Sequence, residues 1–259
     1  MDCYIFDPHQ MVRQIVVVGL GGTGSHVARN LARLLYHRQQ NRQFVPEMLF
    51  VDPDVIEDNN IGRQLFVPAE MNQPKAAVLA RRYNYAFGLR ISAICGPLDA
   101  RKHIESGAIV CGCVDNHHAR REIAKASRPC TWIDAGNEFD FGQVIIGNTG
   151  DWQTVFAGLD RARGGQSAVL PHAGLLFPSL LEPEPKTEQP GLELSCAELA
   201  ARGDQHLYIN DFMGSLVTQY VYQLLNRDPI TTFATFVTLS PSASVRGVPF
   251  TRENLSAYR

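Results

Sequence analysis

Short apolar runs alternate with stretches of helical periodicity through about residue 150, and this pattern predicts strands alternating with helices. The run QIVVV at 14–18 leads into a glycine cluster, and EMLFV at 47–51 is a second run of the same kind. Between them, apolar residues recur at helical spacing from Ser25 to about Gln39. Further strands are predicted at 90–94, 108–114, 131–135 and 142–147, and further helices at 75–85 and 117–127. This order is typical of an α/β fold with a doubly wound, mostly parallel sheet.

The pattern changes after about residue 150. Residues 164–190 combine paired glycines, several prolines and mixed charge, which predicts a long loop. A continuous apolar helix is predicted at 208–225, and two β-like runs follow between 230 and 250. We therefore divide the chain into a core at 1–160, a crossover loop at 161–205, and a C-terminal helix with an antiparallel β extension at 206–259.

Composition limits the partners that can be expected. The net charge of −2 gives no global field that would recruit nucleic acid or an anionic membrane. The N-terminal residues lack the basic-then-apolar order of a secretory signal, and no apolar run approaches the roughly 20 residues that span a bilayer. The chain has six cysteines, and all but Cys196 are typical of buried free thiols in a reducing compartment. We expect a cytoplasmic protein with no membrane or nucleic-acid partner.

The glycine cluster predicts a phosphate-binding turn. Gly19, Gly21, Gly22 and Gly24 lie between a strand and a helix, where glycines let the backbone approach an anion and helix amides attract it. The GxGxxG spacing suits a nicotinamide dinucleotide equally well. Asp52, at the end of the second strand, suits a ribose hydroxyl with either ligand. A turn that only packs the helix on the sheet remains an alternative.

The segments that follow Asp52 carry a more specific pattern. They read DPDVIEDNNIGRQ at 52–64, QPKA at 73–76 and VDN at 114–116. Together with the glycine turn, this ordered set resembles the adenylation domain of the ThiF/MoeB/HesA and ubiquitin-activating superfamily, which has a Rossmann-like fold. The shared pattern is GxGGxGS, then D-x-D with N-x-x-R-Q, a lysine that opens the next helix, and a D-N pair. Residues 134–136 and 142–144 are also similar to the family.

The resemblance covers roughly residues 14–150. The start of the chain and the C-terminal TFVTLSPSASVRGVPFT most resemble the ThiF-like proteins of PRTRC cassettes on mobile elements. The chain departs from the family in lacking paired CxxC zinc ligands and an N-terminal arginine motif. Whether an arginine from a partner subunit reaches the ATP site therefore stays open.

The resemblance implies ATP- and Mg²⁺-dependent adenylation of the C-terminal carboxylate of a small ubiquitin-like (β-grasp) protein, sulfur carrier or peptide. Attack on the α-phosphorus needs positioning and charge neutralisation, which Arg63 and Lys75 would supply. Asp115 would hold Mg²⁺, although a helix cap is its ordinary alternative. Asp52 would bind the ribose. The nucleotide-binding set is Gly19, Gly21, Gly22, Thr23, Gly24, Ser25, Asp52, Asp54, Asn60, Arg63, Gln64 and Lys75.

Two further expectations rest on the family. Cys196, in LSCAE, resembles the crossover-loop cysteine of several members and would attack the acyl adenylate to form a thioester. Its alternative is a small buried thiol. The apolar helix at 208–225 and the family precedent predict a homodimer, whereas burial against its own domain is the alternative.

Other functions stay open at this point. The substrate could be another carboxylate or carbonyl group, such as a peptide terminus or a modified tRNA base. The chain could also be a non-catalytic scaffold or a nicotinamide oxidoreductase. Arg120, Arg121 and Lys125 form a basic helix face, which we interpret as solvated rather than as a docking surface for a partner.

Overall fold

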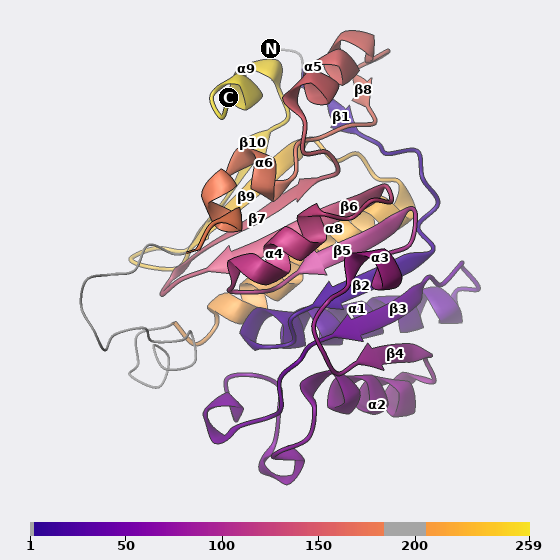
Figure 1. Ribbon diagram of the computed structural model, residues 1–259, viewed down its shortest axis with the longest axis vertical. Helices are drawn as coiled ribbons and strands as arrows, with labels where there is room; N and C mark the ends of the chain where they lie inside the picture. The colour runs from indigo at the N-terminus through magenta and orange to yellow at the C-terminus, as the bar shows by residue number, and fades with distance from the viewer. Residues whose placement is uncertain (1–2, 184–205) are drawn as a thin grey trace.

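The computed structural model describes residues 3–183 and 206–259. An eight-stranded sheet in the order β10-β9-β7-β6-β5-β2-β3-β4 runs through this part of the chain (Figure 1). A small two-stranded sheet pairs β1 (Ile5–Phe6) with β8 (Gln166–Ser167). The strands of the large sheet are β2 (Gln14–Val18), β3 (Glu47–Val51), β4 (Ile91–Ile94), β5 (Ala108–Gly112), β6 (Cys130–Asn137), β7 (Phe141–Gly147), β9 (Thr232–Thr238) and β10 (Ser244–Pro249).

The strand directions divide the large sheet into two parts. Strands β4, β3, β2, β5 and β6 are parallel, whereas β7, β9 and β10 continue the sheet antiparallel. The predicted Rossmann-like sheet with a C-terminal antiparallel extension is confirmed. The chain runs from β2 outward to β4 and then returns to β5 on the other side of β2. The strand order thus reverses between β2 and β5, and α/β sheets bind ligands at the carboxyl ends of strands at such a point.

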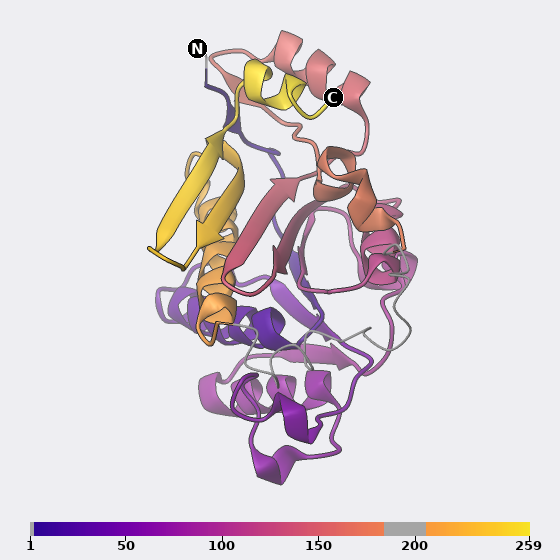
Figure 2. The same ribbon diagram turned by 90° about the vertical axis from the view of Figure 1, so that its left-hand side faces the viewer.

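Helices cover both faces of the sheet. Figure 2 shows α1 (Gly22–Gln40) and α8 (Ile209–Asn226) on one face, and α4 (His117–Ala124) and α6 (Ala173–Leu176) on the other. All residues of β2 and β5 are buried, as expected for parallel strands covered on both sides. The remaining helices and 3₁₀ turns are η1 (Asp58–Asn60), η2 (Pro68–Glu70), α2 (Lys75–Phe87), α3 (Ala100–His103), α5 (Trp152–Arg161), η3 (Pro178–Leu181) and α9 (Arg252–Ser256).

The segment that glycine and proline content predicted as a loop contains ordered elements. Residues 164–183 include β8, α6 and η3, and Leu170 and Leu176 are buried in the core. Elements β8, α6 and η3 are short, so their few apolar residues give no clear period among the turn-forming residues. Helix α5 was also not predicted, although Trp152, Val155, Phe156 and Leu159 recur at helical spacing after the N-cap Asp151. The rest of the predicted crossover loop, from 184 to 205, lies outside the described residues.

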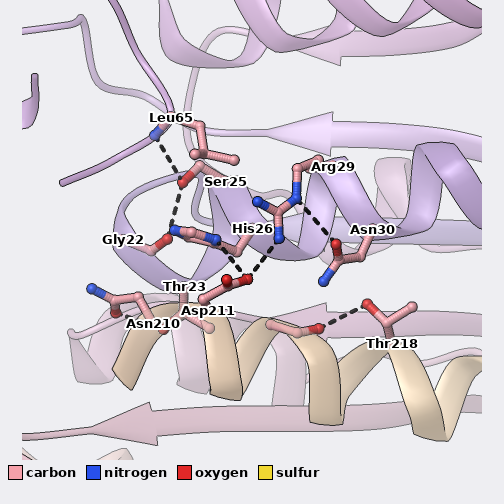
Figure 3. A network of polar contacts seen from close by, with 11 residues as sticks. Gly22, Thr23, Ser25, His26, Arg29, Asn30, Leu65, Asn210, Asp211 and Thr218 are labelled. Atoms are coloured by element: carbon pink, nitrogen blue, oxygen red, sulfur yellow. Dashed lines mark hydrogen bonds and ion pairs between the residues drawn. The ribbon is translucent and has the colours of Figure 1, made fainter. Parts of the chain in front are cut away.

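Helices α1 and α8 pack closely against each other. A Cβ atom on Gly214 of α8 would lie only 2.7 Å from Cβ of His26 in α1, so glycine is required at this crossing. The Oδ1 atom of Asp211 accepts a hydrogen bond from Nη2 of Arg29 at 2.6 Å and lies 3.1 Å from Nδ1 of His26 (Figure 3). Burial lowers the pKa of His26. Burial opposes ionisation of Asp211, but the hydrogen bond and charge of Arg29 lower its pKa.

The apolar side of α8 is therefore covered within the chain itself. Its buried residues include Ile209, Met213 and Val217, which face α1 and strands β6, β7 and β9. This is the second of the two alternatives for the helix, and a twin subunit is not needed to cover that face. The homodimer stays a prediction. No helix in the described ranges is both long and apolar enough to cross a membrane.

Candidate nucleotide-binding site

A cavity of about 1250 Å³ lies at the carboxyl ends of the parallel strands. Most of the predicted site residues line it, namely Gly19, Gly21, Gly22, Thr23, Asp52, Asp54, Asn60, Arg63, Gln64, Lys75 and Asp115. Gly24 and Ser25 lie beneath the turn rather than in the cavity wall. Cys196 lies outside the described residues. The structure thus brings together residues from four separate segments of the sequence pattern.

The glycine turn is held too tightly for side chains at two of its positions. Gly19 has φ of +81°, and a Cβ atom there would lie 2.5 Å from the carbonyl oxygen of Cys113. A Cβ atom on Gly24 would lie 1.8 Å from the carbonyl oxygen of Gly19. Gly24 therefore allows the first turn of α1 to pack directly on the end of β2.

The N-terminus of α1 opens onto the cavity without a capping side chain from any described residue. By contrast, the side chains of Asp99, Asn116 and Asp151 cap α3, α4 and α5. The first backbone N–H groups of a helix have no partner within the helix, and the helix dipole favours negative charge there. This end of α1 therefore fits an anion such as a phosphate group.

Asp52 anchors the glycine turn as well as lining the cavity. It is only 2% exposed, its Oδ1 accepts a hydrogen bond from the backbone N–H of Asp54 at 2.8 Å, and its Oδ2 accepts one from the N–H of Leu20. Burial raises the pKa of Asp52, and the two amide hydrogen bonds oppose that shift. Each carboxylate oxygen keeps a further lone pair, so the predicted contact with ribose hydroxyls fits this geometry.

Positive charge enters the cavity from the segment after β3. Lys75 begins α2, is 6% exposed, and places Nζ 3.0 Å from Oδ2 of Asp54. Arg63 lines the same cavity. A buried ammonium group is costly unless it meets negative charge, and Asp54 supplies part of that charge. The polyphosphate of a nucleotide would supply the rest.

Asn60 and Gln64 lie on the same wall. The Oδ1 atom of Asn60 accepts a hydrogen bond from the backbone N–H of Glu57 at 3.0 Å, so this side chain also holds the η1 turn. The Oε1 atom of Gln64 is buried and accepts no hydrogen bond from any residue in the described ranges. Buried polar atoms usually have a partner, so Gln64 is suited to bind a ligand in the cavity.

Asp115 follows β5 and is exposed at the cavity wall. The alternative that it caps the next helix is wrong, because the neighbouring Asn116 is the N-cap and its Oδ1 accepts a hydrogen bond from Ala119 N–H at 2.9 Å. A carboxylate at the end of a parallel strand, next to an anion-binding turn, has the oxygen ligands that Mg²⁺ prefers. The residues present thus fit a magnesium–nucleotide complex.

Two asparagines that the sequence pattern did not predict also hold the turn. The Oγ1 atom of Thr23 lies 2.9 Å from Oδ1 of Asn137. It also lies 3.0 Å from Oδ1 of Asn210, the second residue of α8; Figure 3 shows Thr23 and Asn210. A Cβ atom on Gly22 would lie 2.8 Å from the amide of Asn210. No local motif could have found Asn210, because Thr23 and Asn210 are 187 residues apart in the sequence.

The interpretation of Arg120 as part of a solvated face is wrong. Arg120 is 7% exposed, and its Nε donates to Oδ1 and Oδ2 of Asp134 at 3.3 and 3.4 Å. Burial raises the pKa of Asp134, and the guanidinium of Arg120 opposes this shift. Arg120 precedes the buried Ile123 by three residues on α4 and therefore shares its buried side. That spacing was the available signal. Lys125 is exposed, as expected for a solvated residue.

The reversed strand order and the glycine turn before α1 define a Rossmann-like α/β domain with a cavity at its switch point. A family model described as the ThiF family matches residues 11–241. The chain therefore belongs to the ThiF family, as its sequence pattern indicated.

Among characterised relatives, the chain is 37% identical over 75 residues to the NEDD8-activating enzyme E1 catalytic subunit of Saccharomyces cerevisiae, covering 29% of this chain and 22% of that protein. Its fold is similar to crystal structures of MccB from E. coli with ATP (TM-score 0.57, 16% identity, 93% of this chain and 64% of that one). It is also similar to PaaA (TM-score 0.55, 14% identity, 92% and 64%). The chain thus spans less than two thirds of these proteins.

Proposed function

We propose that this protein uses ATP and Mg²⁺ to adenylate the C-terminal carboxylate of a small protein or peptide. The observation that carries the proposal is the convergence of an uncapped helix N-terminus, two basic residues and a strand-end carboxylate on one cavity. The basic residues are Arg63 and Lys75, and the carboxylate is Asp115. A cofactor that only lends a hydride needs no such concentration of charge.

Each residue has a separate role in this proposal. The first amides of α1, together with Arg63 and Lys75, neutralise the phosphate oxygens. Asp115 would hold Mg²⁺, which would help to neutralise the phosphate charge, and Asp52 would accept hydrogen bonds from the ribose. A carboxylate oxygen of the substrate forms a bond to the α-phosphorus. The bond from that phosphorus to the bridging oxygen breaks, and pyrophosphate leaves with the electron pair.

The first candidate substrate is a ubiquitin-like or sulfur-carrier protein of the β-grasp type. Similarity to a NEDD8-activating enzyme supports this candidate. A short peptide is the second candidate, because the fold is also similar to that of MccB solved with MccA and AMPCPP. Both candidates present a free C-terminal carboxylate, so they share the chemistry proposed for the cavity.

Nucleotide choice gives the direct test of this function. We expect calorimetry to show that ATP binds in the presence of Mg²⁺ and that NAD does not, since the cavity carries charge suited to a triphosphate. With a cognate carboxylate substrate, labelled pyrophosphate should exchange into ATP. Tight NAD binding without ATP binding would contradict the proposal and favour a nicotinamide oxidoreductase. Binding of ATP without exchange across candidate substrates would favour a non-catalytic scaffold.

Thioester formation on Cys196 is proposed as a second step. The thiolate sulfur would bond to the acyl carbon, the bond from that carbon to the phosphate oxygen would break, and AMP would leave. With the cognate partner and ATP, we expect a reductant-sensitive adduct that Cys196→Ser abolishes while pyrophosphate exchange persists. Cys3→Ser is a matched control, because Cys3 is an exposed free thiol away from the cavity. An adduct that survives in Cys196→Ser would assign the step to another residue.

A further inference from the structure

The guanidinium of Arg120 is buried at the cavity wall with most of its donors unused by the protein. A guanidinium carries five N–H donors in a planar fork. Within the described part of the chain, only Nε of Arg120 makes a hydrogen bond, to the carboxylate of Asp134. Nη1 and Nη2 of Arg120 are not among the described buried atoms that lack a partner, so they reach the solvent in the cavity, where they can donate to a ligand.

The side-chain amide of Gln143 supplies a second donor close to Arg120. A Cβ atom on Gly136 would lie 3.6 Å from Nη2 of Arg120 and 4.0 Å from Nε2 of Gln143. Gly136 and Gln143 face each other across the β6–β7 pair, and all three residues line the cavity. Because Gly136 has no side chain, the space between the two donors stays open to a small acceptor group.

The position of these donors along the sheet separates them from the expected nucleotide. Asp52 follows β3, the glycine turn follows β2, and Asp115 follows β5. The next strands in the sheet are β6 and β7, which carry Gly136 and Gln143. Neighbouring strands are about 4.8 Å apart, so this spot lies on the far side of the glycine turn from Asp52, within the same cavity. It therefore leaves room for a second reactant beside the proposed nucleotide.

Charge and surface chemistry favour a carboxylate over another phosphate at this spot. Asp134 offsets the charge of Arg120, so the spot offers directed donors with little net charge, which suits a single carboxylate better than a polyphosphate. Phe139 and Phe141, at the same end of the cavity, are 50% and 39% exposed. Exposed aromatic rings suit the residues that precede a peptide C-terminus.

The geometry points to Arg120 and Gln143 as the binding site for the C-terminal carboxylate that the enzyme activates, with Phe139 and Phe141 contacting the preceding residues. This inference rests on the proposed function and adds the acyl site to it. The donors hold the carboxylate while one of its oxygens bonds to the α-phosphorus and pyrophosphate leaves. Arg120 and Gln143 act on substrate binding and position, so their loss should raise KM for the acyl substrate more than it lowers kcat.

The test uses the whole protein with the ATP analogue AMPCPP and Mg²⁺, and acetyl-glycylglycine as the probe. We expect the free acid, and not acetyl-glycylglycinamide, to shift the nitrogen-15 NMR signals of the Arg120 Nε–H and the Gln143 amide. Gln143→Glu places a like charge beside the carboxylate and should weaken acid binding at least about tenfold, as for loss of a hydrogen bond to a charged group. Gln153→Glu, at an exposed position on α5, is the control.

A second variant tests the arginine without leaving a lone buried charge. Arg120→Leu with Asp134→Leu removes both members of the buried pair, which proteins often tolerate. It should keep the melting temperature near that of the wild type, bind AMPCPP normally and lose acid binding.

Three results would each overturn the acyl site. These are equal binding of the acid and the amide, acid binding that Gln143→Glu leaves intact, and no binding of the probe to the wild type. Loss of AMPCPP binding in Gln143→Glu would assign these residues to the nucleotide instead. Failure of the wild type to bind AMPCPP would reject the proposed function separately.

Discussion

Asp115→Asn is expected to lower adenylate formation by about 10²- to 10³-fold, the effect of removing one preorganised charged group from an active site. The side chain is exposed at the cavity wall and the neighbouring Asn116 caps α4, so the substitution removes the proposed metal ligand without removing a helix cap. The fold should therefore persist. Pyrophosphate exchange measures the rate, and calorimetry with and without Mg²⁺ measures the metal-dependent part of ATP binding.

Asp228→Asn is the matched control for this variant. Asp228 is an exposed aspartate outside the cavity, so its neutralisation changes net charge equally without touching the site. If Asp115→Asn retained wild-type exchange and the same Mg²⁺ dependence of ATP binding, the metal role of Asp115 would be rejected. A loss of the same size in both variants would indicate a general effect of net charge.

Lys75→Met should slow adenylate formation by about 10²-fold, because methionine keeps the apolar stem and removes the charge that we propose neutralises the phosphates. Its partner Asp54 lies on the exposed side of the pair, so no buried charge is left unpaired. The free energy of unfolding should change little. Pyrophosphate exchange measures the rate of adenylate formation, and thermal unfolding measures the stability.

Lys102→Met provides the comparison for Lys75. Lys102 also pairs with an aspartate, Asp99, at 2.8 Å, but it is 77% exposed on α3 and lies outside the cavity. Exposed pairs contribute little to stability, so this variant should match the wild type in both measurements. Unchanged exchange in Lys75→Met would show that the ammonium group does not stabilise the transition state.

The parts of the fold and site that could be predicted are those encoded locally. The run 14–18 predicts β2 because buried parallel strands are continuously apolar. The glycines after it predict the turn because a Cβ atom would clash at Gly19, Gly22 and Gly24. Lys75 and Asp115 could be placed because each follows a recognisable strand or opens a helix. Gly24 was predicted to bind the nucleotide, but it lies beneath the glycine turn and supports it.

What could not be predicted depends on contacts between distant segments. From the sequence, Arg120 is predicted to be a surface charge, because nothing local shows that it pairs with Asp134 on β6. Asn210 gives no signal at all, since its role comes from the way α8 meets the glycine turn. The short elements at 164–183 were missed because tertiary packing, rather than periodicity, buries Leu170 and Leu176.

The packing of α1 on α8 has a consequence for the order of events during synthesis. His26 and Asp211, which join the two helices, are 185 residues apart. While the chain emerges from the ribosome, α1 is complete long before α8 exists to cover it, and the glycine turn lacks its contact with Asn210. Until α8 is made, the face of α1 that packs on it stays uncovered, and we expect chaperones to bind this exposed surface. The glycine turn reaches its final set of contacts only when α8 has been made.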